Sequence, residues 1–107
     1  MDAITELTGA LRDFTAERGW EPYHSPKNLV MALSVEAAEL VEIFQWLTPE
    51  QAANVMDDPE TAEHVREEVA DVFAYLLNVC DSLGVDLAQA LRDKMVKNAV
   101  KHPVPES

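Results

Sequence analysis

Four carboxylates in two equally spaced pairs are the residues of this sequence best suited to chemistry. Glu36 and Glu39 form one pair and Glu68 and Asp71 form the other, each separated by three residues. On a helix this spacing places both side chains on one face. Both pairs also lie within strongly apolar helical patterns, where acidic side chains are rare unless they are paired. Removing several like charges from water together is unfavourable, so we expect a cation to compensate them.

A helical wheel at about 100° per residue assigns the four acids unequal positions. Glu36 lies inside the apolar arc of its helix, and Glu39 lies at the edge of that arc. Glu68 lies at the margin of the apolar stripe on the second helix, with Asp71 and Tyr75 beside it. If the two helices pack side by side, the carboxylates converge at the edge of the core.

Basic residues that could neutralise these acids are scarce on both helices. The first helix has no Lys or Arg after Lys27, and the second has only Arg66, on its opposite side. The alternative is that each acid pairs with a more distant base or reaches past the core to solvent. The shortage of bases favours a metal site over that alternative.

The ligand type narrows the choice of metal. An all-oxygen site favours Mg²⁺, Mn²⁺ or Ca²⁺ over zinc and copper, which usually recruit imidazole or thiolate. A di-iron bundle would need Glu-x-x-His on helices, and here that spacing occurs only from Glu21 to His24, interrupted by Pro22. Mg²⁺ is therefore the best candidate, with Mn²⁺ as a substitute. It usually retains waters and binds a few carboxylates together with substrate phosphates.

The elements that position these acids are predicted to be helices throughout. Apolar spacing and capping signals predict helices over residues 3–18, 26–47, 59–83 and 87–102, with a short helical turn starting at residue 49. Gly19 and Gly84 close two of these helices, and no segment requires a strand. We therefore expect a single all-α domain over residues 1–107, a compact bundle of four main helices with a short extra helix.

Composition limits the setting and the partners. With 48% apolar residues among 107, the chain is expected to fold, and no run approaches a membrane span. The formal charge of −12 argues against nucleic acid. The N-terminal residues lack the pattern of a secretory signal, so a cytoplasmic location is expected. The lone Cys80 falls in an apolar stripe and is interpreted as a core residue.

Two segments resemble the MazG-like, all-α nucleoside triphosphate pyrophosphohydrolases. The runs 36–46 (EAAELVEIFQW) and 67–76 (EEVADVFAYL) are similar to the paired Glu-x-x-Glu and Glu-x-x-Asp signature of that family. The runs 17–29 (ERGWEPYHSPKNL), 94–98 (KMVKN) and 101–104 (KHPV) are similar to its dCTP pyrophosphatase branch. The resemblance extends over nearly the whole chain.

The resemblance implies hydrolysis of a nucleoside triphosphate to the monophosphate and pyrophosphate. The substrate would be dCTP, a modified dCTP or another non-canonical dNTP, and the role would be nucleotide-pool sanitation. Mg²⁺ would be held by four catalytic carboxylates, Glu36, Glu39, Glu68 and Asp71. Such a metal activates a coordinated water and neutralises charge developing on the phosphates.

The resemblance also assigns residues to the substrate. It places Lys94, Asn98 and Lys101 on the polyphosphate, with Tyr75 nearby, and the spacing of the first three independently puts them on one face of the last helix. The branch further implies that the indoles of Trp20 and Trp46 hold the base, and His24 lies in the matching loop. Because stacking on an indole accepts any base, hydrogen bonds must select among the bases.

Two alternatives to an enzyme remain at this point. The chain could be a non-catalytic module that binds nucleotide and metal, or a purely structural acidic bundle. The second alternative leaves the inward Glu36 unexplained. The apolar content of such short helices predicts a homo-oligomer, and the resemblance implies a dimer or a tetramer built from dimers.

Overall fold

The chain is all helical over the part that the structure describes. The computed structural model describes residues 1–106, which form five α-helices and two short 3-10 helices and contain no strand. In chain order the elements are α1 (Ala3–Glu17), η1 (Glu21–Tyr23), α2 (Pro26–Phe44), α3 (Pro49–Ala53), η2 (Val55–Asp57), α4 (Pro59–Leu83) and α5 (Leu87–Lys101). The predicted helices are confirmed, with ends that differ by up to three residues.

Each α-helix begins where its sequence supplies a cap. At every N-cap a side-chain oxygen accepts a hydrogen bond from the backbone N–H three residues further on; the N-caps are Asp2, Ser25, Thr48, Asp58 and Asp86. This bond satisfies one of the donors that the first turn leaves free. The α3 start is a complete capping box, because the Gln51 side chain also accepts from the Thr48 N–H.

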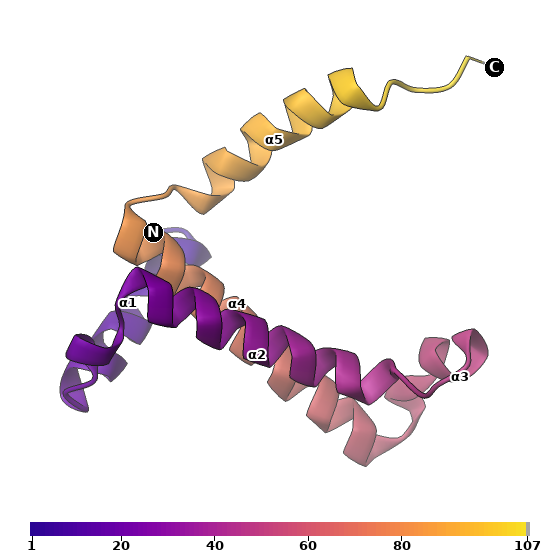
Figure 1. Ribbon diagram of the computed structural model, residues 1–107, viewed down its shortest axis with the longest axis horizontal. Helices are drawn as coiled ribbons and strands as arrows, with labels where there is room; N and C mark the ends of the chain where they lie inside the picture. Colours follow the sequence, from indigo (N-terminus) through magenta and orange to yellow (C-terminus); the bar gives the residue numbers. More distant parts are fainter. Residues whose placement is uncertain (107) are drawn as a thin grey trace.

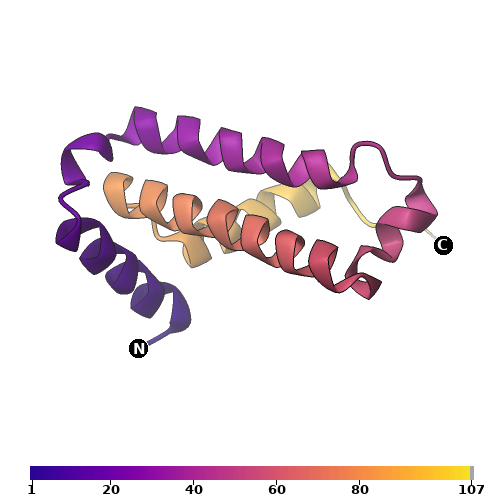
Figure 2. The same cartoon turned by 90° about the horizontal axis from the view of Figure 1, so that it is seen from below.

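The helices α2 and α4 form the centre of the molecule. They run antiparallel and side by side, joined through α3 and η2, while α1 packs against α4 near its C-terminal end (Figures 1 and 2). The interior of this three-helix unit contains buried apolar residues from α2 and α4: Leu29, Ala62, Leu77 and Cys80. Cys80 is thus a core residue, as its apolar stripe predicts.

The last helix departs from the expected bundle. α5 projects away from α2 and α4 (Figure 1), and its residues from Gln89 to Lys101 are all exposed. The direction changes at Gly84, whose φ of +69° lies in the left-handed region that favours glycine. The expectation of one compact four-helix bundle is therefore wrong for the single chain. α5 nonetheless carries large apolar side chains, among them Leu91, Met95 and Val96, that the single chain leaves exposed.

Within residues 1–106, none of the helices combines the length and the apolar character needed to cross a bilayer.

Candidate functional site

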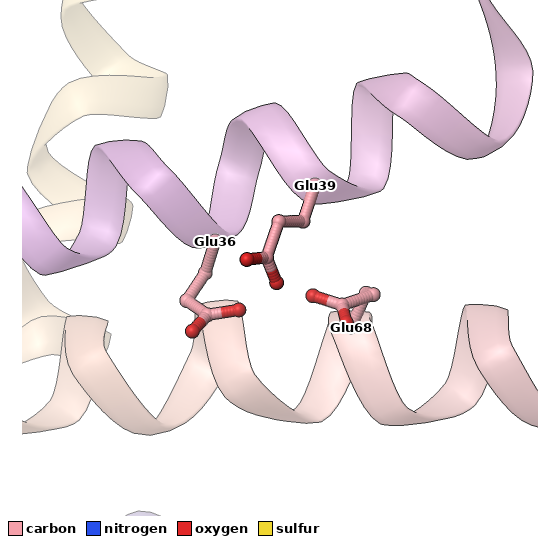
Figure 3. A group of neighbouring side chains, drawn as sticks. All are labelled: Glu36, Glu39 and Glu68. Atoms are coloured by element: carbon pink, nitrogen blue, oxygen red, sulfur yellow. The ribbon is translucent and has the colours of Figure 1, made fainter.

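Three of the four predicted carboxylates meet between α2 and α4. Glu36 and Glu39 extend from adjacent turns of α2 toward α4, and Glu68 extends from α4 toward them (Figure 3). One carboxylate oxygen from each lies within 4.8 Å of one from each of the others. The side chains converge because Glu36 and Glu39 lie on the face of α2 that packs against α4, opposite Glu68.

The cluster contains buried oxygens that lack hydrogen-bond partners. Glu68 is only 8% exposed, and the Oε2 atoms of Glu36 and Glu68 are both buried without a partner in the described part of the chain. A buried carboxylate oxygen without a partner is strongly unfavourable. A divalent cation would satisfy these oxygens, and an all-carboxylate set fits Mg²⁺ or Mn²⁺.

The pKa values of two of the carboxyl groups in the cluster are raised, with burial as the main cause. Burial, followed by the neighbouring carboxyl groups of Glu39 and Glu68, raises the pKa of Glu36 from 4.5 to about 7. Burial also raises the pKa of Glu68; the carboxyl group of Glu36 opposes this rise, and Glu39 and Asp71 add to it. Without a cation, the cluster therefore retains a proton at pH values where an ordinary carboxyl group is ionised.

Asp71 lies beside the cluster and not within it. It is exposed, and its oxygens are outside the group of three that meet within 4.8 Å. Its charge nonetheless contributes to raising the pKa values of Glu36 and Glu68. Asp71 thus occupies the open side of the cluster, one turn along α4 from Glu68.

His64 is a neighbour of the cluster that the sequence analysis missed. Its Nε2 lies 3.6 Å from Oε1 of Glu68, one turn earlier on α4. The signal was available, since residues four apart on a helix are neighbours. The nearby Arg66 instead pairs with Glu63 at 3.3 Å. No Lys or Arg among residues 1–106 forms an ion pair with Glu36, Glu39 or Glu68.

A cavity of about 250 Å³ opens beside Asp71, between α1, α4 and the loop that follows α1. Its lining combines aromatic, small and polar residues: Leu11, Phe14, Thr15, Trp20, His24, Asp71, Ala74, Tyr75 and Asn78. Three of the predicted substrate-binding residues, Trp20, His24 and Tyr75, therefore meet in one cavity. We refer to it below as the aromatic cavity.

The Trp20 side of the aromatic cavity is held by contacts between rings and a cation. The rings of Phe14 and Trp20 meet edge to face, with centroids 5.8 Å apart. The Arg18 guanidinium carbon lies 3.5 Å from the centroid of the Phe14 ring, and Arg18 also donates a hydrogen bond to the Phe14 carbonyl. Such contacts restrain the aromatic wall before any ligand binds.

Four other predicted residues are not brought to this site by the single chain. Trp46 follows α2 at the end away from Trp20, about 28 Å along a helix of this length, and is 86% exposed. Lys94, Asn98 and Lys101 lie on the exposed helix α5. In the single chain these four side chains therefore lie outside both the carboxylate cluster and the aromatic cavity.

Comparison with known proteins identifies relatives of this chain. Over 92 residues the chain is 39% identical to dCTP pyrophosphatase 1 of Bos taurus, and over 91 residues it is 38% identical to dCTP pyrophosphatase 1 of Homo sapiens. These alignments cover 86% and 85% of the chain, and the chain spans about half (54%) of the length of each relative.

A solved structure matches over almost its entire length. The crystal structure of a pyrophosphatase from Archaeoglobus fulgidus DSM 4304 superposes with a TM-score of 0.89 at 41% sequence identity, covering 97% of this chain and 95% of that one. Residues 31–107, which include both carboxylate pairs and α5, match the MazG-like family. The chain is a member of the MazG-like family.

Proposed function

We propose that the protein hydrolyses nucleoside triphosphates to the monophosphate and pyrophosphate with the help of Mg²⁺, for which Mn²⁺ can substitute. The observation that carries the proposal is the pair of buried oxygens without partners, on Glu36 and Glu68, next to a cavity with an aromatic wall. The carboxylates would bind the metal and, through it, the phosphates, and the aromatic cavity would bind the base. Nucleotide-pool sanitation is the cellular role that this activity would serve.

The metal would be held by Glu36, Glu39 and Glu68, with Asp71 on the open side of the cluster. When bound, it would supply activation of water and neutralisation of charge on the phosphates. The chain itself contributes carboxylates fixed on two packed helices, so their positions change little when substrate binds. His64, near Glu68, would orient that carboxylate.

The base would stack in the aromatic cavity. Trp20 offers an indole that packs edge to face with Phe14, and Tyr75 and His24 supply polar atoms at the same cavity. Because Asp71 lines this cavity as well as bordering the carboxylates, a nucleotide could reach from one to the other. The relatives named dCTP pyrophosphatase make dCTP and modified dCTP the first substrates to test.

The phosphate-binding residues would come from a second copy of the chain. The exposed helix α5 carries Lys94, Asn98 and Lys101 on one face, and Trp46 is exposed at the end of α2. The first 86 residues contain 18 acidic and 4 basic residues, whereas residues 87–107 contain 4 basic and 2 acidic residues. A basic α5 is thus complementary to the acidic body of another copy.

Apolar surface on α2 supports the same assembly. Val30, Val35 and Val41 are each about half exposed, on a helix that is apolar on most sides. Beside them lies an apolar groove of about 410 Å³, lined mainly by residues of α2: Ala37, Leu40, Val41, Phe44, Gln45 and Val72. Exposed apolar surface of this kind marks an interaction site, so we propose a dimer or a dimer of dimers.

Product analysis with purified protein tests the activity. The protein is incubated with Mg²⁺ and each of several dNTPs, and the nucleotides are separated to detect monophosphate and pyrophosphate. Glu68→Gln is expected to lose turnover, while Glu42→Gln, which changes an exposed carboxylate of α2 outside the cluster, keeps it. Absence of pyrophosphate from every nucleotide would refute the proposal. Thermal stabilisation by nucleotide without turnover would point to a binding module.

Mixing two inactive variants tests the contribution of the second copy. Glu68→Gln and Lys94→Ala are each expected to be inactive as homo-oligomers. If Lys94 acts across copies, a refolded equimolar mixture regains about a quarter of wild-type activity, because half of the dimers are mixed and each has one intact site. No recovery, in mixtures shown to contain both chains in one oligomer, would place Lys94 in its own chain's site.

A further inference from the structure

Asn78 occupies the far end of a polar row along α4. Asp71, Tyr75 and Asn78 are spaced by four and three residues, so they share one helix face with the aromatic cavity. Seven residues separate Asp71 from Asn78, which corresponds to about 10 Å along the helix axis. Asp71, near the proposed phosphate position, and Asn78 are therefore at opposite ends of this row, and the row is about as long as a nucleotide.

Asn78 also lies where the aromatic cavity meets a second one. Thr15, His24 and Asn78 line both the aromatic cavity and a neighbouring cavity of about 190 Å³. None of these three side chains forms a hydrogen bond with another of the described residues. The amide of Asn78 is partly buried, yet its donor and its acceptor are both available to a ligand.

We propose that the Asn78 amide binds the hydrogen-bonding edge of a pyrimidine base at ring positions 3 and 4, an inference that rests on the proposed function. Cytosine presents an acceptor at N3 and an amino donor at position 4, which match the amide NH₂ and C=O. Uracil and thymine present a donor at N3 and an acceptor at O4, which match the same amide turned by 180°. Trp20 would hold the face of the ring while Asn78 reads its edge.

The freedom of the amide has a consequence for selectivity. Since no group of the described chain fixes which way the amide points, either orientation is available to it. The pocket is then selective for a pyrimidine edge but does not discriminate strongly between cytosine and uracil rings. We expect kcat/KM values for dCTP and dUTP that agree within about tenfold.

A cycle of two enzymes and two substrates tests the contact. Wild type and Asn78→Leu are each assayed with dCTP and with the analogue whose 4-amino group is replaced by hydrogen. For wild type, loss of the amino group is expected to lower kcat/KM roughly tenfold to a hundredfold. For Asn78→Leu, which keeps the size of the side chain but has no polar atoms, the two substrates should be equivalent.

This ratio separates recognition from a general effect on folding. A structural role for Asn78 would lower both rates together and leave their ratio at the wild-type value, because the ratio does not depend on the fraction of active protein. Ser82→Ala is the matched control, since Ser82 lies one turn further on α4 and lines only the neighbouring cavity. It should keep the wild-type ratio.

The outcomes distinguish failure of this inference from failure of the proposed function. If wild type hydrolyses no nucleotide, the proposed function fails and the inference falls with it. If wild type is active and Asn78→Leu discriminates between the two substrates as wild type does, only the role of Asn78 is refuted. A dCTP to dUTP preference well above tenfold in wild type would refute the rotating amide.

Discussion

Replacing Glu36 by Gln should stabilise the metal-free protein while abolishing turnover. Glu36 has a carboxylate oxygen buried without a partner, and its pKa is raised from 4.5 to about 7. Above pH 7 the folded chain must therefore hold a charge that its surroundings oppose. The amide of Gln has nearly the same shape and no charge, so the substitution removes that opposition.

The size of the effect follows from the pKa shift. One pKa unit corresponds to about 1.4 kcal/mol, so a rise from 4.5 to about 7 sets an upper limit of roughly 3.5 kcal/mol. Glu36 is only half-buried, and solvent screening reduces this to about 1–2 kcal/mol. In a domain of this size the corresponding increase in Tm is about 5–15 °C.

The same shift makes wild-type stability depend on pH. Because the pKa of Glu36 is higher in the folded state, the folded chain keeps a proton that the unfolded chain has already released between about pH 4.5 and 7. The free energy of unfolding is therefore greatest below this window and falls as pH rises through it. Glu36→Gln should be insensitive to this contribution, so the two proteins should differ more at pH 8 than at pH 5.

Urea unfolding in a chelating buffer, followed by circular dichroism at fixed protein concentration, measures both effects. Glu42→Gln is the control, because it removes an exposed charge from the same helix and is not part of the cluster. Adding Mg²⁺ should reverse the order, since the ion stabilises only a chain that binds it. The reasoning is refuted if Glu36→Gln destabilises the metal-free protein at pH 8, or if its difference from wild type is the same at pH 5.

Three further predictions concern the rest of the fold. Leu77→Ala, at a position 2% exposed between the helices, should lower the free energy of unfolding by about 2–5 kcal/mol in urea titrations, and a loss below 1 kcal/mol would contradict its role in the core. Cys80 is buried and burial raises the pKa of its thiol, so a thiol reagent at pH 8 should label it only after unfolding; rapid labelling of the native protein would be inconsistent with this. Arg12 contacts Asp81 through two nitrogens, at 2.6 and 3.2 Å, but the Arg12 side chain is exposed, so Arg12→Ala should shift the midpoint of urea unfolding only slightly, and less at high salt; a large shift would contradict this.

Features set by neighbours in the sequence could be predicted from the sequence alone. The helix starts at Ser25, Thr48 and Asp58 follow from side chains that bond to the backbone three residues away. The three carboxylates that meet were also predictable, because Glu36 and Glu39 share a face and an antiparallel partner brings Glu68 opposite. Helical periodicity supplies the shared face, and the side-by-side packing of the two helices is the one further assumption that this prediction needed.

Features that depend on distant parts of the chain could not be predicted in this way. Helical periodicity places Lys94 and Lys101 on one face of α5, but it does not determine where that helix lies. Asp71 was expected to hold the metal with the other three acids, and its exposed position depends on how far α2 and α4 overlap. The aromatic cavity likewise depends on the crossing of α1 over α4, which no single helix pattern specifies.

The left-handed turn at Gly84 lies between the packed helices α1, α2 and α4, which stabilise the fold, and α5, which carries the proposed phosphate-binding residues. A Cβ at this position would meet no atom within 4 Å, so a substitution there would leave the packing of α1, α2 and α4 undisturbed. It would still oppose the φ of +69°, and with it the direction in which α5 leaves the body. Glycine at this position therefore sets the direction of α5, and with it the surface that the basic helix reaches. A lineage could redirect assembly, and the phosphate-binding residues with it, through one backbone angle and without repacking the core.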